Sequence, residues 1–397
     1  MNHVLVLNSG SSSIKYQLVD LTTGEAAAGG LVERIGEAEG SLRHDGPAGR
    51  TERTQVVPDH TAGVRAVLDL FEEVGPSLTD LEIAAVGHRV VQGGDRFTEP
   101  TLVDDDVEAA IEDLAPLAPL HNPPNLAGIR AARTAFPDLP HVAIFDTAFH
   151  HTLPPEAYTY AIDRETARAY GIRRYGFHGT SHAYVSRRAA AMLGKDPSEV
   201  NVIVAHLGNG ASITAVEGGC SVETSMGLTP LEGLVMGTRS GDIDPAVIFH
   251  LQRVGGMSTD DIDTLLNRRS GLLGLAGVND LRDLHTAIEA GDEDAALALE
   301  VYCHRLRHYV GAYYAQLGRV DAIAFTAGVG ENDDVVRLEA LSGLERLGIV
   351  VDPERNEGRK KAETVISPDD AEVAVLVIPT NEELEIAQQA VAVVQGA

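Results

Sequence analysis

Apolar and polar residues alternate along the chain with two different periods, and together these periods predict an α/β protein. Short apolar runs predict strands at residues 4–7, 83–86, 142–145, 320–325 and 373–378. Apolar residues at helical spacing predict helices at residues 104–113, 123–136, 182–193, 292–317 and from 380 onward. Strands that alternate with helices are typical of the α/β class. Residues 25–50, which are rich in Gly and Ala, are predicted to form a surface loop.

Two stretches predict hairpins rather than strand–helix units. Near the N-terminus an apolar run is followed by a polar turn, Asn8–Ser12, and by an alternating strand, Ser13–Asp20. Residues 201–219 repeat this order of apolar strand, Gly-rich turn and alternating strand, and Ser212-Ile213 aligns with Ser13-Ile14 without a gap. The repeat, about half a chain apart, favours two similar halves. Two unrelated hairpins would give the same pattern.

Length and charge narrow the class of protein. A chain of 397 residues is expected to form two domains. The net charge of −28, with only four lysines and no basic run, argues against a nucleic-acid partner. No apolar stretch approaches the ~20 residues of a membrane span, and the short N-terminal apolar run lacks a basic leader, so we expect a cytoplasmic protein without a membrane partner. Cys220 and Cys303 fit no metal or redox spacing and are expected to be reduced, partly buried thiols.

Three glycine-rich turns that follow apolar strands are candidates for phosphate binding. NSGSSSIK (Asn8–Lys15) is not a Walker loop, because Lys15 lies in an alternating strand rather than at the start of a helix. The backbone N–H groups of a tight Gly/Ser turn can nevertheless bind an anion. HLGNG (His206–Gly210) and AFTAGVGEN (Ala324–Asn332) offer the same chemistry. Each turn alone could be structural, but three in one chain favour a nucleotide.

Arginine and histidine occur next to glycine in several loops. Arg89 is predicted to follow the strand at 83–86, and Arg239 lies between glycines in MGTRSGDIDP. Arginine binds carboxylate and phosphate through two hydrogen bonds, although a surface ion pair is the commoner role. His178 and His182 do not form an HExxH metal motif, and Gly179 is predicted to break a helix between them. Hydrogen bonding to phosphate, or a structural role, is therefore expected of His178.

Acidic residues stand at two strand ends. Asp146 follows the strand at 142–145, a common place for a catalytic carboxylate as well as for a turn-forming Asp. The last helix is predicted to begin with a capping box from Thr380 to Glu383, which would leave Glu382 able to hold a hydrated Mg²⁺. His121 precedes two prolines, and we expect it to be fixed in a loop.

In order along the chain, the motifs VLVLNSGSSSIKYQL, GHRVVQGG, PLAPLHNPPN, FDTAFH, RYGFHGTSH, HLGNGAS, MGTRSGDIDP, AGVGEN and PTNEELEIA resemble the acetokinase family. That resemblance implies two duplicated RNase H-like domains of the actin-like ATPase fold with a central cleft. The N-terminal domain would comprise residues 1–148, with the helix at 381–397 packing back on it. The C-terminal, nucleotide-binding domain would comprise residues 149–380. Gln92 stands where many members of the family have His.

The resemblance also implies roles for individual residues. Asn8 and Glu382 would organise Mg²⁺, mostly through water. Arg89 would bind the substrate carboxylate, and His178 and Arg239 would stabilise the phosphoryl group in transfer. Asp146 would orient Arg89 or the substrate rather than act as a base, because acetate is already ionised at neutral pH. The substrate methyl pocket would consist of Val91, Leu120, Phe177 and Pro230. ATP would be bound by Ser11, Ser13, Lys15, His206, Leu207, Gly208, Asn209, Gly210, Asp280, Leu281, Arg282, Gly328, Val329, Gly330, Glu331 and Asn332.

The implied reaction is the reversible, direct in-line transfer of the ATP γ-phosphate to acetate, which gives acetyl phosphate and ADP. Its cofactor would be Mg²⁺, with Mn²⁺ as an alternative, and the protein would be a homodimer. A propionate or butyrate kinase of the same family is an alternative, since one methylene in a pocket is worth only ~1–3 kcal/mol. An actin-like ATPase or a non-catalytic scaffold is a further alternative. The first has no need of the set Arg89, His178 and Arg239, and the second has no need of Asn8, Asp146 and Glu382.

Overall fold

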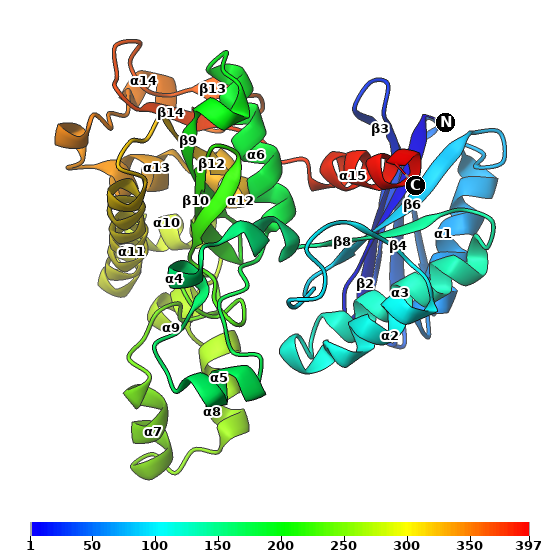
Figure 1. Cartoon of the computed structure of the whole chain (residues 1–397), viewed down its shortest axis with the longest axis horizontal. Helices are drawn as coiled ribbons and strands as arrows, with labels where there is room; N and C mark the ends of the chain where they lie inside the picture. Colours follow the sequence, from blue (N-terminus) through cyan, green and yellow to red (C-terminus); the bar gives the residue numbers. More distant parts are fainter. Residues whose placement is uncertain (1, 397) are drawn as a thin grey trace. The chain divides into compact units, whose positions relative to one another are not determined.

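The computed structural model describes residues 2–396, which form two compact α/β units (Figure 1). The first unit comprises the chain up to His151 together with the segment from Asn381 onward, and the second comprises Thr152–Thr380. Each unit is built around one sheet.

The first unit has an eight-stranded sheet in the order β5-β4-β3-β2-β1-β6-β8-β7. Strands β1, β6 and β8 are parallel to one another, and the other neighbouring pairs are antiparallel. The strands are β1 (His3–Ser9), β2 (Ser13–Asp20), β3 (Glu25–Glu33), β4 (Gly40–Gly46), β5 (Gly49–Gln55), β6 (Ile83–Val90), β7 (Thr101–Leu102) and β8 (His141–Phe145). The helices are α1 (His60–Val74), α2 (Asp105–Asp113), α3 (Asn122–Ala135) and α15 (Glu382–Gly396).

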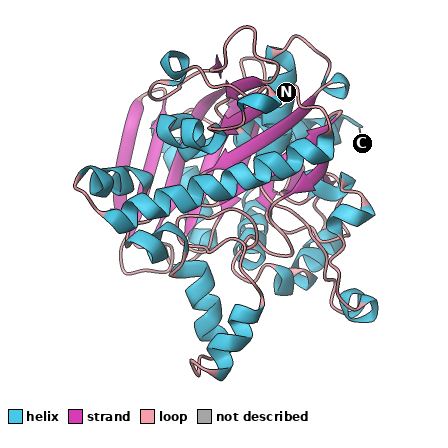
Figure 2. Ribbon diagram, turned by 90° about the vertical axis from the view of Figure 1, so that its left-hand side faces the viewer, coloured by secondary structure: helices cyan, strands magenta, loops and turns pink. Residues whose placement is uncertain are grey.

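The second unit has a six-stranded sheet in the order β11-β10-β9-β12-β14-β13. The strands are β9 (Asn201–Leu207), β10 (Ala211–Glu217), β11 (Cys220–Thr224), β12 (Ala322–Thr326), β13 (Thr364–Val365) and β14 (Ala374–Val377). The helices are α4 (Pro155–Tyr158), α5 (Arg164–Ala169), α6 (Gly179–Met192), α7 (Ala246–Arg253), α8 (Thr259–Arg268), α9 (Gly271–Ala276), α10 (Leu281–Glu289), α11 (Glu293–Leu317), α12 (Ala327–Asn332), α13 (Asp334–Leu341) and α14 (Pro353–Asn356). The long helix α11 packs against β9 and β10 and lies in front of the strands in Figure 2.

The two sheets repeat one strand order. Six strands of the first-unit sheet, in the order β3-β2-β1-β6-β8-β7, correspond one by one to the six strands of the second-unit sheet, in the order β11-β10-β9-β12-β14-β13. Neighbouring strands are parallel or antiparallel at the same places in both sheets. The predicted duplicated α/β fold is therefore confirmed. The ungapped alignment of the two hairpins does not hold in register, because Ser9 pairs with Ile14 whereas Leu207 pairs with Ala211. The first hairpin therefore carries the longer tip.

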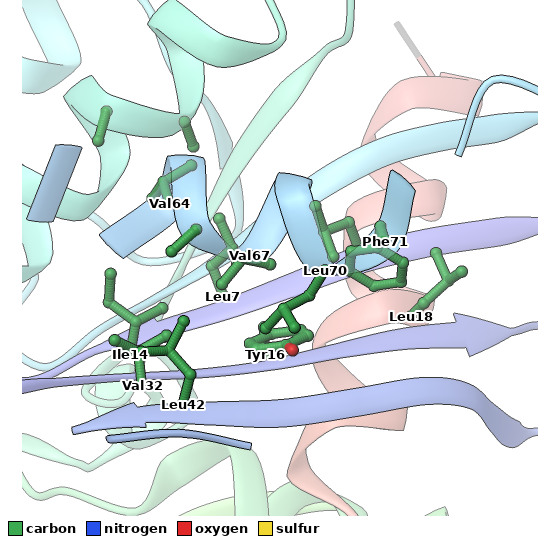
Figure 3. Packing of buried hydrophobic residues seen from close by; sticks show 14 of the residues in the cluster. Leu7, Ile14, Tyr16, Leu18, Val32, Leu42, Val64, Val67, Leu70 and Phe71 are labelled. Carbon is green, nitrogen blue, oxygen red and sulfur yellow. The ribbon is translucent and has the colours of Figure 1, made fainter. Parts of the chain in front are cut away.

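The apolar side chains of the first unit bury both faces of its central strand β1. On one face Leu7, Ile14 and Tyr16 pack against Leu70 and Phe71 of α1 (Figure 3). On the other face Val4 and Val6 pack against α15. Burying a side chain the size of Leu or Phe contributes about 1.5–3 kcal/mol. Burial on both faces explains why residues 4–7 are continuously apolar rather than alternating.

Helix α15 approaches β6 closely at a glycine. A Cβ atom at Gly87 would lie 2.8 Å from a methyl carbon of Ile386, so a larger residue there would push the helix away from the sheet. This contact fixes the start of α15, and with it Glu382, relative to β6.

Residues 25–50 were predicted to be a loop, and this prediction is wrong: they form β3, β4 and the start of β5. Alternate residues Ala28, Val32 and Leu42 are buried against α1, but small residues between them hide the period. Gly30 is required by packing, because a Cβ there would overlap the Arg43 carbonyl and the Tyr16 ring.

Several predicted element ends shift. β1 continues through Asn8, and β6 continues through Arg89, so both residues lie within strands rather than after them. Helix α6 begins at Gly179 instead of being broken there, since His178 adopts the left-handed conformation (φ 55°) before it. The final helix begins at Glu382.

The cap of that final helix also differs from the prediction. The backbone N–H of Leu384 donates to Asn381 Oδ1 at 3.0 Å, so Asn381, and not Thr380, caps α15. Glu383 forms an ion pair with Lys15 instead of closing a capping box. Both Thr and Asn are good N-caps, and a capping residue one position along the chain satisfies the same requirement.

No helix within residues 2–396 is both long enough and apolar enough to cross a lipid bilayer. Cys303 is buried in α11, as expected, but Cys220 is exposed, because it opens β11 directly after the Gly218-Gly219 turn. Neither cysteine is in a disulfide.

Candidate active site

The tip of the β1–β2 hairpin is a tight, exposed turn. The Gly10 N–H donates to the Ser13 carbonyl at 2.8 Å, and Ser11 is exposed. The imidazole of His60, at the start of α1, lies 2.8 Å from the Gly10 carbonyl through Nε2 and holds the turn. Lys15 faces Asn8 across the hairpin. The predicted phosphate loop is thus a turn in which Ser11 and Ser12 are exposed, whereas Ser9 is buried and Ser13 is half-buried. The support from His60 was not predicted.

Arg89 and Asp146 form a bidentate pair at adjacent strand ends of the first unit. Arg89 Nε donates to Asp146 Oδ1 at 3.0 Å, and Nη2 donates to Oδ2 at 2.6 Å. The Asp146 side chain is 1% exposed and that of Arg89 is 21% exposed. The parallel pairing of β6 with β8 brings them together.

Burial and the neighbouring charges shift the pKa of Asp146 and of Arg89 in opposite directions. Burial raises the pKa of Asp146 above its ordinary value, while the Arg89 guanidinium acts in the opposite direction. Burial lowers the pKa of Arg89, but the charges of Asp146 and Glu382 outweigh that effect and raise it. Glu382 Oε2 lies 3.9 Å from Arg89 Nε. One guanidinium therefore stands between two carboxylates.

Two buried asparagines of α3 fasten the chain that follows Arg89. Asn122 accepts from Gln92 N–H (3.0 Å) and donates to its carbonyl (2.9 Å). Asn125 accepts from Val91 N–H (3.1 Å) and donates to the Ser9 carbonyl (2.6 Å). The asparagines therefore link the Arg89 segment to the hairpin. The HNPPN motif was the available signal, but only its histidine was singled out.

The residues predicted to form the methyl pocket differ in exposure. In the first unit Val91 is buried and Leu120 is 54% exposed. In the second unit Phe177 is buried and Pro230 is half-buried, and the Pro230 carbonyl accepts a hydrogen bond from Arg239.

The predicted Mg²⁺ ligands belong to the first unit. Asn8 lies in β1 and Glu382 opens α15. Within residues 2–396 there is no group of three or more His, Cys, Asp or Glu side chains arranged to hold a metal. A donor set of one amide and one carboxylate fits a cation that keeps most of its water, as Mg²⁺ does, better than one that needs a full protein shell.

Three histidines gather beside β10 in the second unit. His178 Nδ1 lies 2.9 Å and His182 Nε2 lies 2.7 Å from Ser212 Oγ. The rings of His178 and His206 stack with their centroids 4.2 Å apart. A hydroxyl has one proton, so Ser212 donates to one histidine and accepts from the other. This arrangement fixes the ring of His178 by hydrogen bonding.

Arg239 has a different environment from Arg89. Its Nη1 donates to the Pro230 carbonyl at 2.8 Å, and it forms no ion pair within residues 2–396. Burial alone lowers its pKa. A Cβ at Gly210 would lie 3.5 Å from the guanidinium and 3.7 Å from the His178 ring, so both side chains converge on the β9–β10 turn. A half-buried guanidinium without a carboxylate is suited to binding an anion.

A cavity of about 1000 Å³ opens in the second unit beside this turn. Its size suits a nucleotide-sized ligand. The predicted nucleotide residues that line it are Gly208, Asn209, Asp280, Leu281, Arg282, Gly328, Val329 and Asn332. The fold thus brings to one cavity three segments that are far apart in sequence: the β9–β10 turn, the start of α10 and the start of α12.

Five predicted nucleotide residues of the second unit do not line the cavity. His206 and Leu207 belong to β9 and are buried, and His206 Nδ1 lies 2.8 Å from Ser181 Oγ. Gly330 is buried within α12, and Gly210 faces Arg239. Glu331 accepts a hydrogen bond from Thr380 N–H at 3.2 Å, and burial raises its pKa.

The cavity also has lining residues that the sequence analysis missed. They are Gly237, Leu272, Asn279, His285, Ile288, Glu289, Tyr302, Asp333, Asp334, Val335 and Arg359. Leu281, His285 and Ile288 follow the period of one face of α10, which was the available signal. Asp280 caps this helix and bonds Arg282 through Nε (2.9 Å) and Nη2 (2.6 Å), which holds the pKa of Asp280 at about 2.

Arg337 supports the Gly328–Asn332 segment from behind. Its side chain is fully buried, and it donates to the Gly330 carbonyl (3.0 Å), to Asn356 Oδ1 (2.7 Å) and to the Gly358 carbonyl (2.9 Å). Since it binds backbone carbonyls on two sides, it ties α12 to α14. Nothing in the sequence pattern distinguishes this arginine from a surface one.

A further charged network holds the irregular segment that carries Pro230. Arg174 Nη2 donates to Glu232 at 2.6 Å, and Tyr160 donates to the other oxygen of the same carboxylate. Asp242 accepts from Gly233 N–H and from Tyr309, each at 2.8 Å. These contacts give a segment without helix or strand a fixed shape.

Known proteins resemble this chain along nearly its whole length. The model of the acetokinase family matches residues 3–388. The chain belongs to the acetokinase family. The acetate kinase of Clavibacter michiganensis subsp. michiganensis is 63% identical over 393 residues, which cover 99% of both chains. The acetate kinase of Streptomyces avermitilis is 62% identical over 98% of this chain and 97% of its own.

Solved structures of the family agree with the fold. The acetate kinase of Porphyromonas gingivalis has a TM-score of 0.95 at 43% identity and covers 99% of this chain and all of its own. A propionate kinase from Francisella tularensis has a TM-score of 0.92 at 42% identity, with 98% and 99% covered. The prediction, made from the motifs, of an acetokinase-family phosphotransferase with a carboxylate acceptor is therefore confirmed.

Proposed function

We propose that this protein transfers the γ-phosphate of ATP to acetate, reversibly and in one in-line step, to give acetyl phosphate and ADP. The observation that carries the proposal is the contrast between a carboxylate-paired arginine, Arg89, and an arginine without an ion pair, Arg239, in a chain that also has a nucleotide-sized cavity. Relatives at more than 60% identity that are named acetate kinases support acetate as the acceptor.

In the proposed mechanism Arg89 binds the acetate carboxylate. Asp146 occupies its Nε and Nη2, so Nη1 is the guanidinium nitrogen left for the substrate. Asp146 thus acts as a positioning residue. It need not remove a proton, because acetate is ionised at neutral pH. Val91, Leu120, Phe177 and Pro230 are proposed to surround the methyl group.

ATP is proposed to bind with its base and ribose in the second-unit cavity. Gly328, in the first turn of α12, offers a backbone N–H group that a phosphate can approach without meeting a Cβ, and Asn209 offers a backbone N–H and a side-chain amide from the β9–β10 turn. The other proposed nucleotide residues are His206, Leu207, Gly208, Gly210, Asp280, Leu281, Arg282, Val329, Gly330, Glu331 and Asn332. The residues of this set that do not line the cavity are proposed to act by shaping the turns that do. Ser11, Ser13 and Lys15 are proposed to donate to the transferring phosphate.

The transfer itself depends on placing positive charge where negative charge develops. His178 and Arg239, which converge on Gly210, would donate to the equatorial oxygens of the planar phosphoryl group. Arg239 has no carboxylate to give up, so its charge is available in full. Positioning of the two substrates supplies most of the remaining acceleration.

Mg²⁺, or Mn²⁺ in its place, is the proposed cofactor. When bound, it would neutralise the phosphate oxygens that the leaving ADP carries away. Asn8 and Glu382 would hold it through its waters, and Glu382 would at the same time face Arg89.

A hydroxamate assay with purified protein and Mg-ATP tests the proposal. Acetate, propionate and butyrate are compared at equal concentration, with water as the control. Acyl phosphate formed fastest from acetate is the expected result. Loss of ATP without acyl phosphate from any acid would overturn the kinase and favour an actin-like ATPase.

The alternative acceptor is propionate or butyrate. The observation behind it is the structural likeness to a propionate kinase, which is 42% identical, but relatives at 60–63% identity that are named acetate kinases favour acetate. The same assay separates the two, since faster reaction with propionate would leave the mechanism unchanged and alter the acceptor.

A homodimer formed through the second unit is also proposed. Helix α7 is mostly apolar yet buries none of its residues, and Phe249 is 52% and the following Val254 is 73% exposed. A second copy of this chain would cover such a surface. Light scattering is expected to give the mass of a dimer, and Phe249→Asp is expected to shift it toward the monomer. A monomeric parent protein would refute this.

The cytoplasm is the proposed location. It supplies ATP, and it keeps thiols such as Cys220 and Cys303 reduced, as both are here. Fractionation of cells with an antibody to the protein would check it.

A further inference from the structure

The cavity of the second unit has two kinds of wall. Glycine-bearing turns line one part of it, and the side chains of Leu272, Leu281, Ile288 and Val335 give the rest an apolar character. A nucleotide has the same two-part chemistry, since its phosphates bind N–H groups and its base packs against apolar side chains. Polar side chains within the apolar part of the cavity are therefore candidates for hydrogen bonding to the nucleobase and recognising it.

His285 is such a side chain. It lies on α10 between Leu281 and Ile288, on the face of the helix that lines the cavity, and is 28% exposed (α10 is labelled in Figure 1). Its Nε2 lies 2.8 Å from Asp333 Oδ2. Within residues 2–396 its imidazole forms no other hydrogen bond.

Asp333 fixes the hydrogen-bonding character of His285. Asp333 Oδ1 accepts from the Val336 N–H at 2.9 Å and caps α13, so the carboxylate is held in place, and it is only 11% exposed. An ionised carboxylate only accepts hydrogen bonds, so the proton must be on His285 Nε2. In the neutral imidazole Nδ1 is then an acceptor.

We propose that the Asp333–His285 pair selects the nucleobase, with His285 Nδ1 accepting a hydrogen bond from the exocyclic amino group of a 6-aminopurine. The inference rests on the proposed ATP site and names the group that recognises the base there. A 6-oxopurine presents an oxygen at that position and would set two acceptors against each other. A site built to bond a donor discriminates against a ligand without it, because its own polar group is left unpaired.

Equilibrium binding of ATP and inosine triphosphate, without acetate, tests the selection. These nucleotides differ at position 6, amino in ATP and oxo in inosine triphosphate, and as a consequence at N1, which accepts a hydrogen bond in adenine and carries a proton in hypoxanthine. The parent protein is expected to prefer ATP by about two- to tenfold, the range of one neutral hydrogen bond. His285→Leu is expected to abolish the preference. His304→Leu, at an exposed histidine of α11, is the matched control and should keep it.

Asp333→Asn is the sharper variant. Asn also caps helices, so its oxygen is expected to keep the bond to Val336 N–H. Its amide nitrogen would then face His285 Nε2 and donate to it, which moves the imidazole proton to Nδ1. The preference should reverse toward inosine triphosphate. A role for the pair in stability alone would not produce a reversal.

The outcomes separate this inference from the proposed function. An unchanged ATP preference in both His285→Leu and Asp333→Asn would overturn the inference, and so would failure of the parent protein to bind either nucleotide. If His285→Leu does not fold, Asp333→Asn alone decides. Acyl phosphate formation by the parent protein is measured separately. If the protein forms acyl phosphate but does not prefer ATP, only the role of His285 and Asp333 in base selection is refuted. If it binds ATP selectively but forms no acyl phosphate, only the kinase activity is refuted.

Discussion

The two site arginines, Arg89 in the first unit and Arg239 in the second, have opposite surroundings. Arg89 is bonded to Asp146 through two nitrogens and has a second carboxylate, Glu382, at 3.9 Å. Arg239 touches a backbone carbonyl and a thioether sulfur and no carboxylate within residues 2–396. Neighbouring carboxylates therefore raise the pKa of Arg89 despite its burial, whereas burial alone acts on Arg239 and lowers its pKa.

The difference corresponds to the ligands proposed for each. A monovalent carboxylate substrate needs orientation more than charge, and an arginine already shared with Asp146 binds it weakly enough for release. A phosphoryl group in transfer carries more negative charge and exists only briefly. An arginine whose charge is not neutralised beforehand stabilises such a transition state most, because nothing must be displaced when it forms.

The largest expected effect is that of Arg239→Ala. We expect kcat to fall by ~10³-fold or more, as when an arginine is removed from phosphoryl transfer elsewhere. Stability should change little, because no carboxylate is left unpaired. Steady-state kinetics and thermal melting check both expectations. Arg346→Ala, at an exposed arginine of the same unit, is the control; near-normal turnover by the Arg239 variant would remove its assigned role.

Asp146→Asn, unlike Arg239→Ala, should lower stability as well as activity. It leaves the Arg89 guanidinium without its charged partner, and removing one member of a buried ion pair costs about 3 kcal/mol. We expect kcat/KM for acetate to fall by roughly 10²-fold, the scale on which misplacing a substrate lowers the rate, together with a lower melting temperature. Activity lost at unchanged stability would mean that Asp146 acts on the substrate directly.

Arg89→Lys should have a smaller effect. Lysine keeps the charge but lacks the fork that bonds Asp146 through two nitrogens. We expect KM for acetate to rise about tenfold, equivalent to about 1.4 kcal/mol, with KM for ATP unchanged. A rise in both constants would contradict the assignment of Arg89 to the carboxylate alone.

The same contrast shows what could be read from sequence. Motif order predicted that Arg89, Asp146, His178 and Arg239 belong to a site, and the hydrophobic period predicted the strands that carry the first two. The resemblance implied that Asp146 would orient Arg89 or the substrate, but the residue pattern alone could not predict the pair, because Asp146 reaches Arg89 only through the parallel register of β6 and β8. His285 and Asp333 likewise meet through packing between helices, 48 residues apart.

Errors occurred where small residues hide a period or where two residues can serve equally. Residues 25–50 form strands because glycines such as Gly30 permit close packing, a tertiary requirement that no local pattern expresses. His206 and Glu331 lie in glycine-rich motifs and stay predicted ATP residues, but neither lines the cavity, because His206 belongs to the buried strand β9 and Glu331 accepts a hydrogen bond from Thr380. In the two motifs the residues that line the cavity are Gly208, Asn209, Gly328, Val329 and Asn332.

The smallest expected effect is a dependence of the stability of the first unit on pH. His88 precedes Arg89 in β6, and its Nε2 lies 3.0 Å from Nδ1 of His141 in β8. Burial lowers the pKa of both imidazoles. The unfolded chain, with a histidine pKa near 6.5, therefore binds protons that the folded chain does not. The stability contributed by the neutral pair is complete above pH ~6.5 and declines as the pH falls toward the lowered folded-state values.

Melting of the protein between pH 7.5 and 5.5 should accordingly show a falling melting temperature, in a range where most carboxylates stay ionised. His88→Gln keeps a hydrogen-bonding side chain but cannot be protonated, so it should flatten the profile. His304→Gln, at an exposed position, should not. Since β6 carries Arg89 and β8 leads directly into Asp146, acid should weaken the framework of the paired arginine. A profile equally steep in His88→Gln would show that the proton uptake lies elsewhere.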